Sequence, residues 1–195
     1  MGPTVRSPSF ALPTVAGPLA ALVLASLLWG TADVAGKLAL EAIPPAMLAA
    51  LRFAVALAIL WPLARWHGAP RVPARVTAPL GLVGVALTFL LQNLGLDRTT
   101  ATNASLLQGA APVLTLLLAA VVLGERLGSR RLAAVGLAMT GVAAVTLPGS
   151  GGVYAPGLGD ALVLASTGCF AAFVVLGRRA FPIYDTLPVL AGMAA

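Results

Sequence analysis

Long apolar stretches follow one another along this 195-residue chain with only short breaks between them, and they limit what it can fold into. Hydrophobic residues make up 59% of the chain and charged residues only 9%, which is too few charges to cover a water-soluble domain. A helix crosses the bilayer core, about 30 Å thick, with about 20 apolar residues. The sequence therefore predicts an all-α fold, a polytopic transmembrane helix bundle. The spans we expect are residues 18–40, 46–65, 77–96, 101–123, 131–147 and 158–177.

Basic residues gather in every second connection between these spans. Lys and Arg concentrate in the short cytoplasmic loops of membrane proteins, so this alternation predicts the orientation of the chain. The N-terminus with Arg6 is expected in the cytoplasm, and the first span runs outward. Because topology explains the net charge of +6, no nucleic-acid partner is expected, and the surrounding partner is the lipid bilayer. The arginines that set this orientation are Arg65, Arg71 and Arg75, then Arg126, Arg130 and Arg131, then Arg178 and Arg179.

A hexapeptide, Ala-Leu-Val-Leu-Ala-Ser, occurs twice, at residues 21–26 and 161–166. Each copy opens a long apolar helix pattern, which indicates one structural unit that appears twice. The first unit holds an odd number of spans, so the second must start from the opposite side of the membrane. This predicts a five-helix inverted-topology repeat plus the start of a second, an arrangement found in many secondary transporters.

A segment rich in Gly and Pro, residues 148–157, separates the two units and is typical of a linker. Before it we expect a cytoplasmic N-terminal tail over residues 1–17 and the first five-helix repeat over residues 18–147. Residues 158–195 begin the second repeat, which we expect to be incomplete because residues 186–195 are too few to cross a bilayer. The chain is thus expected to be truncated at its C-terminal end, and two copies could pair as a homodimer to rebuild a full cavity.

Charged residues inside the spans are candidates for function, because a charge at the bilayer centre costs about 2.5–3.5 kcal/mol. Asp33, the only carboxylate expected within the membrane, lies four residues before Lys37, so both share one helix face and can pair. Arg52 lies at a similar depth in the next span and could pair with Asp33 instead. Two interpretations stay open: Lys37 reaches the outer interface while Asp33 neutralises a cation, or these residues handle the substrate or a proton.

Polar residues gather at the same depth in the third and fourth expected spans. Pro112 lacks an N–H, so it cannot bond the carbonyl of Gln108 and is expected to kink the fourth span there. A freed carbonyl inside a membrane must be met by water, a neighbour or a ligand, so either a hydrogen-bonded kink or a hydrated, outward-opening vestibule fits the sequence. Trp29, near mid-membrane, either packs in the core or stacks on a substrate. The polar residues at this depth are Gln92, Asn93, Asn103, Ser105 and Gln108, and a stripe at helical spacing joins Thr102, Ser105, Gln108, Pro112 and Thr115.

The sequence carries no pattern typical of an enzyme. The single histidine, His67, has no Cys, Asp or Glu cluster near it, so no metal site and no catalytic residue are expected. A Gly-rich phosphate-binding loop is missing as well, which argues against ATP as the energy source, and no cofactor is expected. Cys169, the only cysteine, is expected to be a small packing residue.

Short motifs occur in a fixed order along the chain. They are Trp29-Gly30-Thr31 followed by Lys37, Leu51-Arg52-Phe53, Ala104-Ser105-Leu106-Leu107 leading to Pro112-Val113, Leu123-Gly124-Glu125-Arg126-Leu127, and Gly141-Val142. Together they resemble the EamA family of the drug/metabolite transporter superfamily, from the first span to the sixth. The order and spacing of the fourth-span motif are the most specific part of this resemblance.

The resemblance implies a multi-pass protein of the plasma (inner) membrane, with ten helices in two five-helix repeats. Such a protein moves small metabolites, often outward, and holds them in a central cavity to which the regions of Trp29, Arg52 and Pro112 would contribute. The chain departs from the family at Cys169-Phe170, where a tryptophan is often repeated. It departs again at Asp33, a position usually uncharged in the family, so the role of Asp33 rests on the physical argument alone.

The sequence and the resemblance together predict a secondary transporter that exports small metabolites or drugs by alternating access. The gradient of its small-molecule substrate, or proton exchange at Asp33, would drive it. The alternative is a non-transporting membrane protein, either a truncated remnant or an assembly partner. The residues expected to line the substrate cavity are Trp29, Asp33, Lys37, Arg52, Gln92, Asn93, Asn103, Ser105, Gln108 and Pro112.

Overall fold

The computed structural model describes residues 16–66, 72–124, 128–146 and 157–180, together with Val189 and residues 192–193. Over these residues the regular structure is helical, which confirms the predicted all-α class. Several sequence predictions lie wholly or mostly outside the described residues. These are the N-terminal tail, the Gly/Pro-rich linker, the loop with Glu125 and Arg126, the positions of His67 and Arg71, and most of residues 181–195.

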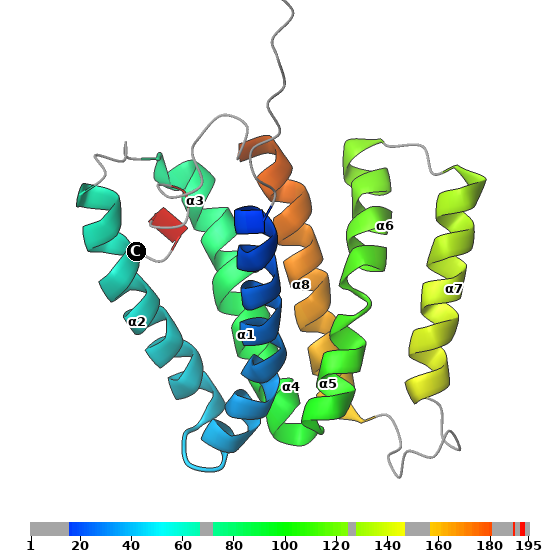
Figure 1. The fold of residues 1–195 in the computed structure, drawn as a ribbon, viewed down its shortest axis with the longest axis horizontal. Coiled ribbons are helices and arrows are strands. Elements are labelled where there is room, and N and C mark those ends of the chain that lie inside the picture. Colours follow the sequence, from blue (N-terminus) through cyan, green and yellow to red (C-terminus); the bar gives the residue numbers. More distant parts are fainter. Residues whose placement is uncertain are drawn as a thin grey trace, which may run out of the picture. The chain divides into compact units, whose positions relative to one another are not determined.

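The helices follow one another with short connections, as the alternation of apolar stretches and Gly/Pro breaks predicts (Figure 1). They are α1 (Ala16–Leu40), α2 (Pro45–Trp66), α3 (Ala74–Gly81), the π-helix η1 (Leu82–Leu87), α4 (Thr88–Arg98), α5 (Ala101–Gln108), α6 (Ala111–Leu123), α7 (Ser129–Thr146) and α8 (Leu158–Ala180).

Five stretches of helix among the described residues are long and apolar enough to cross a membrane. They are Leu19–Leu40, Pro45–Trp66, Ala74–Arg98, Ala101–Leu123 and Leu158–Arg178, and each coincides with a predicted span. The remaining predicted span, 131–147, does form a helix, α7, but it is not among the five. Arg130 and Arg131 in its first turn lower its mean hydropathy, which explains the difference. The chain is therefore a multi-pass membrane protein by length and composition of its helices.

The chain divides into two compact units, one ending at Ala32 and the other beginning at Asp33. The first unit contains the greater part of α1, whose large apolar side chains are exposed, Trp29 among them. Its hydroxyl groups bond within the helix, since Ser26 Oγ donates to the carbonyl of Leu22 at 2.8 Å. A helix with an apolar exterior and internally satisfied polar groups is suited to lipid.

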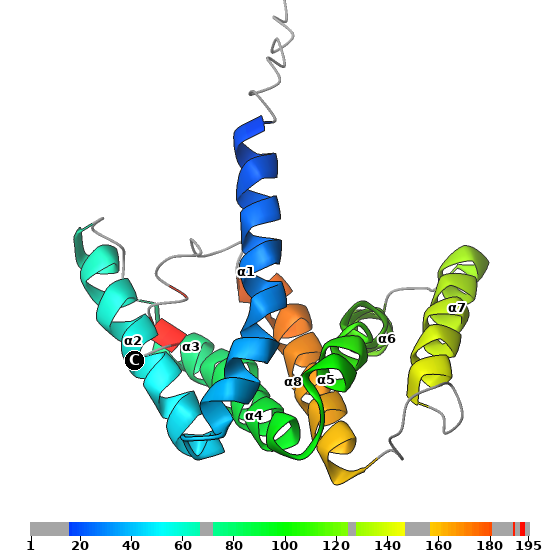
Figure 2. The same cartoon turned by 60° about the horizontal axis from the view of Figure 1, so that its bottom comes forward.

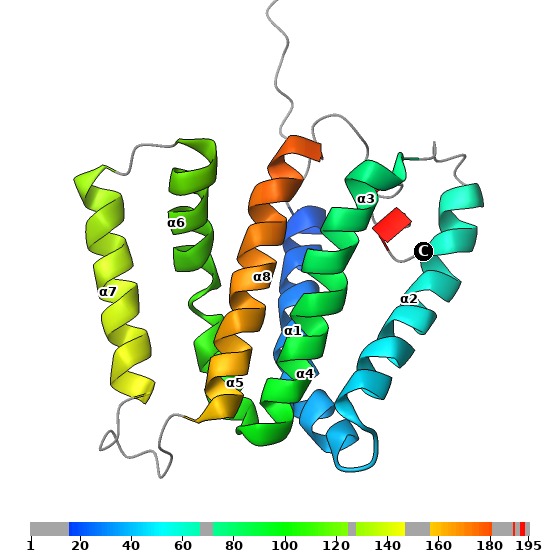
Figure 3. The same ribbon diagram turned by 180° about the vertical axis from the view of Figure 1, so that it is seen from behind.

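In the second unit, α8 lies between α4 and α6 and contacts both (Figure 3). Helix α2 flanks α4 on one side, and α7 flanks α6 on the other (Figure 2). The buried core at one end of this unit joins three helices through Leu96 of α4, Ala104 and Leu107 of α5, and Val163 of α8. The helix that follows the Gly/Pro-rich segment thus belongs to the same core as the helices before it.

Glycines allow α4 and α8 to approach each other closely. A Cβ added at Gly95 would lie 2.7 Å from Val163 Cγ2 and 2.8 Å from the carbonyl oxygen of Gly159. A Cβ added at Gly159 would in turn lie 2.7 Å from the carbonyl carbon of Arg98. Such close contact between backbones is how helices associate in membranes, where no hydrophobic force drives them together.

Two of the membrane spans are not continuous α-helices. The third span changes to the π-helix η1 between α3 and α4, where Thr88 Oγ1 donates to the carbonyl of Val83 at 2.7 Å. The fourth span is interrupted after Gln108, and α6 begins at Ala111 with Pro112 in its first turn. This confirms the interruption predicted from Pro112, because proline fits the first turn of a helix and not its interior.

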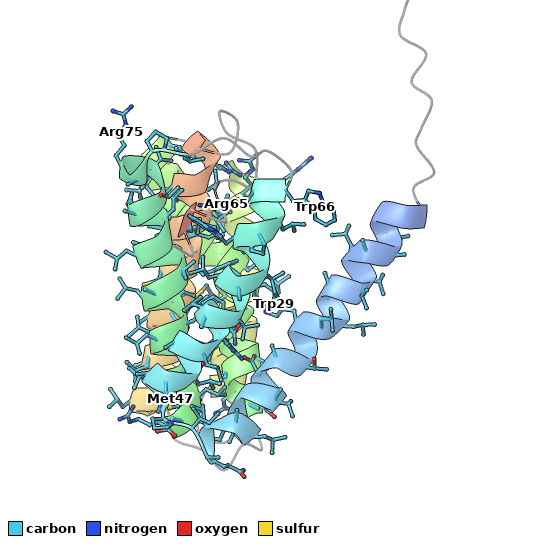
Figure 4. All side chains as sticks on the ribbon, turned by 90° about the vertical axis from the view of Figure 1, so that its left-hand side faces the viewer. Trp29, Met47, Arg65, Trp66 and Arg75 are labelled. Carbon is cyan, nitrogen blue, oxygen red and sulfur yellow. The ribbon has the colours of Figure 1, made fainter. Side chains whose placement is uncertain are left out.

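Figure 4 shows the side chains of this unit at its two ends. Arg65 and Trp66 at the end of α2 and Arg75 at the start of α3 lie at the end opposite Met47, near the start of α2. Arg65 also stacks on Trp61, with Cζ 4.8 Å from the ring centroid. Arg65 and Arg75, on either side of the connection between α2 and α3, therefore lie at the same end of the helices.

Candidate functional site

Asp33 lies at the centre of a polar cluster formed by three helices. Its side chain, only 7% exposed, accepts three hydrogen bonds. Gln92 Nε2 of α4 donates to Oδ1 at 2.9 Å. From α5, Gln108 Nε2 donates to Oδ2 at 2.8 Å, and Ser105 Oγ can donate its one proton to the same oxygen at 2.9 Å or to the carbonyl of Ala101 at 2.9 Å. The structure therefore brings together four residues that the sequence analysis placed at one depth, and we call them the Asp33 cluster.

The local sequence explains how α4 and α5 present these donors. Ser105 and Gln108 are three residues apart, so they share a face of α5. The turn between α4 and α5 is short because Thr100 caps α5, with its side chain accepting from the backbone N–H of Asn103 at 3.1 Å. The end of α4 and the start of α5 consequently lie at the same level, which places Gln92 beside the α5 donors.

The possible ion pair between Asp33 and Lys37 is not formed. Lys37 Nζ donates instead to the main-chain carbonyls of Leu96 at 2.7 Å and Asp97 at 3.1 Å. Carbonyls in the last turn of a helix have no partner within the helix and carry partial negative charge, so the end of α4 attracts the ammonium group. Asp33 is left with neutral donors, an arrangement that helical spacing alone did not reveal.

Arg52 does not pair with Asp33 either, and no ion pair joins them among the described residues. The half-buried guanidinium lies over Phe89 of α4, with Cζ 5.8 Å from the ring centroid. Phe89 is itself held edge-on by Phe53, at 5.5 Å between ring centroids. A Cβ added at Gly36 of α1 would lie 3.3 Å from Arg52 Nη2, so the guanidinium also lies against α1.

The remaining candidate residues occupy other places. Asn93, 1% exposed, donates through Nδ2 to the carbonyl of Pro45 at 3.2 Å and links α4 to α2, while its Oδ1 is buried without a hydrogen-bond partner among the described residues. Asn103 takes part in the α5 cap through its backbone. Trp29 belongs to the first compact unit, so its predicted role in a cavity stays a prediction.

Pro112 lines a pocket between α6 and α8 rather than the Asp33 cluster. This pocket has a volume of about 380 Å³ and is mainly apolar. Its lining residues are Ala111, Pro112, Thr115, Leu116, Ala119, Phe170 and Arg178. Two members of the predicted polar stripe, Pro112 and Thr115, therefore face this pocket, whereas Ser105 and Gln108 face Asp33.

Asp160 is a second buried carboxylate within a membrane span, which corrects the expectation that Asp33 is the only one. Its side chain is 6% exposed and accepts from Thr99 Oγ1 at 2.5 Å and from the backbone N–H of Gly157 at 3.1 Å. An acidic residue in the first turn that bonds the N–H at the start of its helix is a known N-terminal signal. The Gly-Asp pair after the Gly/Pro-rich segment carried that signal, but nothing in the sequence connected it to Thr99.

Among the described residues, no group of three His, Cys, Asp or Glu side chains could hold a metal ion. The Asp33 cluster offers an acceptor surrounded by neutral donors inside a membrane span. Ser105 is exposed, so the cluster is accessible from that side.

Residues 17–147 of the chain match the EamA-like transporter family. A "probable amino-acid metabolite efflux pump" of Escherichia coli (strain K12) is 32% identical over 167 residues, which cover 84% of this chain and 53% of that protein. A "probable terminal-alkyne amino-acid exporter" of Streptantibioticus cattleyicolor is 35% identical over 137 residues, which cover 69% of this chain and 46% of that protein. An "uncharacterized transporter" of Archaeoglobus fulgidus is 30% identical over 172 residues, which cover 85% of this chain and 59% of that protein. The chain spans about half the length of these relatives, and no solved structure matches it.

Proposed function

The chain belongs to the EamA-like transporter family, and we propose that it exports small metabolites across the plasma membrane around the Asp33 cluster. The observation that carries this proposal is a carboxylate buried within a membrane span whose hydrogen bonds, over the described part of the chain, come from neutral side chains of two other helices. Charged residues are costly inside membranes and usually mark the path of a substrate or an ion. Asp33 is therefore the first residue to test.

The outward direction is supported by two relatives whose names describe an efflux pump and an exporter, both for amino-acid compounds. Orientation is supported by the arginines, which favour a cytoplasmic N-terminus. In that orientation the Asp33 cluster lies in the outer half of the bundle, because α1 runs outward and Asp33 is in its last two turns. A vestibule at this end would release substrate to the outside.

The mechanism we propose is alternating access between two inverted repeats. Interrupted helices near the cluster support it: the break between α5 and α6 follows directly after Gln108, and η1 precedes the α4 segment that carries Gln92. Helices that are broken near the site recur in secondary transporters, and π-helical segments often occur at functional sites. Movement at these two places would shift the donors of the Asp33 cluster relative to α1.

The driving force is the substrate gradient or proton exchange at Asp33. An ionised carboxylate can accept from Gln92, Ser105 and Gln108 at once, whereas a protonated carboxyl must donate its proton. The Ser105 bond can then reverse, because its hydroxyl can accept from the carboxyl while it donates to the carbonyl of Ala101 at 2.9 Å. Protonation would in this way rearrange the link from α1 to α5, which is a coupling that proton-driven transport could use.

The test is release of amino acids from liposomes that contain the purified chain, measured against empty liposomes. Asp33→Asn and Gln108→Leu should each lower release by about ten-fold, because each weakens a charge-assisted hydrogen bond. Asp97→Asn is the matched control, since it removes a carboxylate whose side chain is exposed at the end of α4. Release equal to wild type in both cluster variants, with normal membrane insertion, would disprove a transport role for the cluster.

A further inference from the structure

Among the described charged side chains around the Asp33 cluster, Arg52 is one for which the described residues provide no acceptor. Lys37 is bonded to two carbonyls, and the carboxylate of Asp33 is bonded to three donors. The Arg52 guanidinium contacts the Phe89 ring and approaches Gly36, but it makes no hydrogen bond or ion pair within the part of the chain that the structure describes. A half-buried guanidinium inside a membrane span whose N–H donors are not used by the described residues can bind an anion.

The surroundings of Arg52 hold the guanidinium plane in place. Phe89 covers it at 5.8 Å from Cζ to the ring centroid, and Phe53 fixes Phe89 from the side. Gly36 contributes space, because a Cβ there would lie 3.3 Å from Nη2 and 3.2 Å from Leu96 Cδ2. A guanidinium that is stacked on a ring has lost much of its freedom, so less entropy remains to be lost when its N–H groups bind a ligand.

The shape of the group selects the ligand. A guanidinium offers parallel N–H donors that match the two oxygens of a carboxylate. Lipid phosphate is the other common anion, but Arg52 is the eighth residue of α2 and lies about 10 Å along the helix from Pro45, the first. That depth is below the headgroups, so a small carboxylate that enters the bundle is the better match.

We propose that Arg52 binds the carboxylate of the transported metabolite, so that the substrates of this chain are small carboxylates such as amino acids. This inference rests on the proposed function and defines its substrate class. The Asp33 cluster and Arg52 then have different tasks: the cluster responds to protons or to the polar part of the substrate, and Arg52 requires the negative charge.

The test compares free amino acids with their amides, which differ at the carboxylate. Liposomes containing the full chain are loaded with a mixture of proteinogenic L-amino acids or with the matching L-amino-acid amides. Release is followed by mass spectrometry, and release from empty liposomes is subtracted. Wild type should release free amino acids at least about ten-fold faster than amides, since a bidentate charged contact contributes about one order of magnitude or more.

Variants at two stacked arginines of the same helix separate binding from packing. Arg52→Gln should slow amino-acid release and remove the preference over amides, and Arg52→Lys should restore part of it, because an ammonium keeps the charge but not the fork. Arg65→Gln is the control, since Arg65 also stacks on an aromatic ring, Trp61, at the other end of α2, and it should keep the wild-type preference.

Each outcome bears on one of the two claims. Equal release of acids and amides by wild type, or a preserved preference in Arg52→Gln, would overturn the role of Arg52 while leaving the carrier intact. No release of either set by wild type would overturn the proposed function itself. If Arg52→Gln does not yield monodisperse protein, the preference for acids over amides in wild type and in Arg52→Lys still decides whether Arg52 binds the carboxylate.

Discussion

Asp33 illustrates how a carboxyl side chain can be held inside a membrane span without an ion pair to any described residue. Three neutral donors from α4 and α5 replace the water it would have at the surface. Hydrogen bonds to a charged group contribute about 1.5–3 kcal/mol each, so three of them offset a large part of the cost of burial.

Lys37 provides a prediction at the same scale. Lys37→Met should lower stability by about 1 kcal/mol, because it removes two hydrogen bonds to the end of α4 from a site that is partly solvated. The measurement is thermal unfolding of the purified chain in detergent. Glu41→Gln is the control, as Glu41 is exposed just beyond α1. An unchanged unfolding temperature for Lys37→Met would mean that the contact does not hold α1 to α4.

At the scale of elements, α8 is the helix on which the second unit depends. It contacts α4, α5 and α6, its Asp160 binds the α4–α5 turn through Thr99, and its glycine-lined crossing with α4 brings the two backbones together. The helix after the Gly/Pro-rich segment therefore completes the core that holds the Asp33 cluster. Changes at this crossing should disturb the cluster at a distance.

A double-mutant cycle tests the link between α8 and the α4–α5 turn. Thr99→Val and Asp160→Asn should each lower the free energy of unfolding. The double variant should lower it by less than the sum of the two single losses, with a coupling energy of about 1–3 kcal/mol. Chemical or thermal unfolding in detergent gives the change in unfolding free energy of each single variant and of the double variant relative to wild type. Additive losses would show that the hydroxyl and the carboxylate act independently.

The α4–α8 crossing can be tested with two glycines. Gly95→Ala should destabilise by about 1–3 kcal/mol, because the new Cβ would lie 2.7 Å from Val163 Cγ2 and 2.8 Å from the Gly159 carbonyl oxygen. Gly136→Ala on α7 has nothing within 4 Å of its new Cβ and should be neutral or slightly stabilising. If the two variants unfold at the same temperature, the crossing is looser than this geometry.

At the scale of the whole molecule, the orientation of the chain in the membrane decides which side of the membrane the Asp33 cluster lies toward. The ends of α1 and α4 and the starts of α2, α5 and α8 share one end of the helices (Figure 1), and Arg65 and Arg75 lie at the other (Figure 4). Under the positive-inside rule the arginine-rich end is cytoplasmic. An exporter with this orientation would bind its substrate's carboxylate at Arg52 and release it outward.

Cysteine labelling on intact cells checks the orientation. In a Cys169→Ala background, Glu41→Cys should react with a membrane-impermeant maleimide from outside, because Glu41 follows α1 at the outer end. Ala74→Cys, at the start of α3, should react only after the membrane is permeabilised. The reverse labelling pattern would mean that the topology is inverted and that the Asp33 cluster lies in the cytoplasmic half of the bundle.

The sequence by itself determined the class and the longitudinal order of this protein. Hydropathy fixes where helices cross a bilayer, proline fixes where the fourth span breaks, and position along a helix fixes the depth of Asp33, Gln92, Ser105 and Gln108. These properties are local, because a membrane helix satisfies its own backbone and its length is set by the bilayer. That is why five of the predicted spans and the break before Pro112 agree with the structure.

Only the tertiary structure decided which groups meet at a given depth. Helical spacing allowed Asp33 to pair with Lys37, yet Asp33 bonds to α4 and α5, and Lys37 bonds to the end of α4. Asp160 likewise found Thr99 across the α4–α8 crossing. Partners of this kind depend on how each helix is rotated and which helix lies beside it. Those are set by side-chain packing between distant segments, which no spacing within one helix encodes.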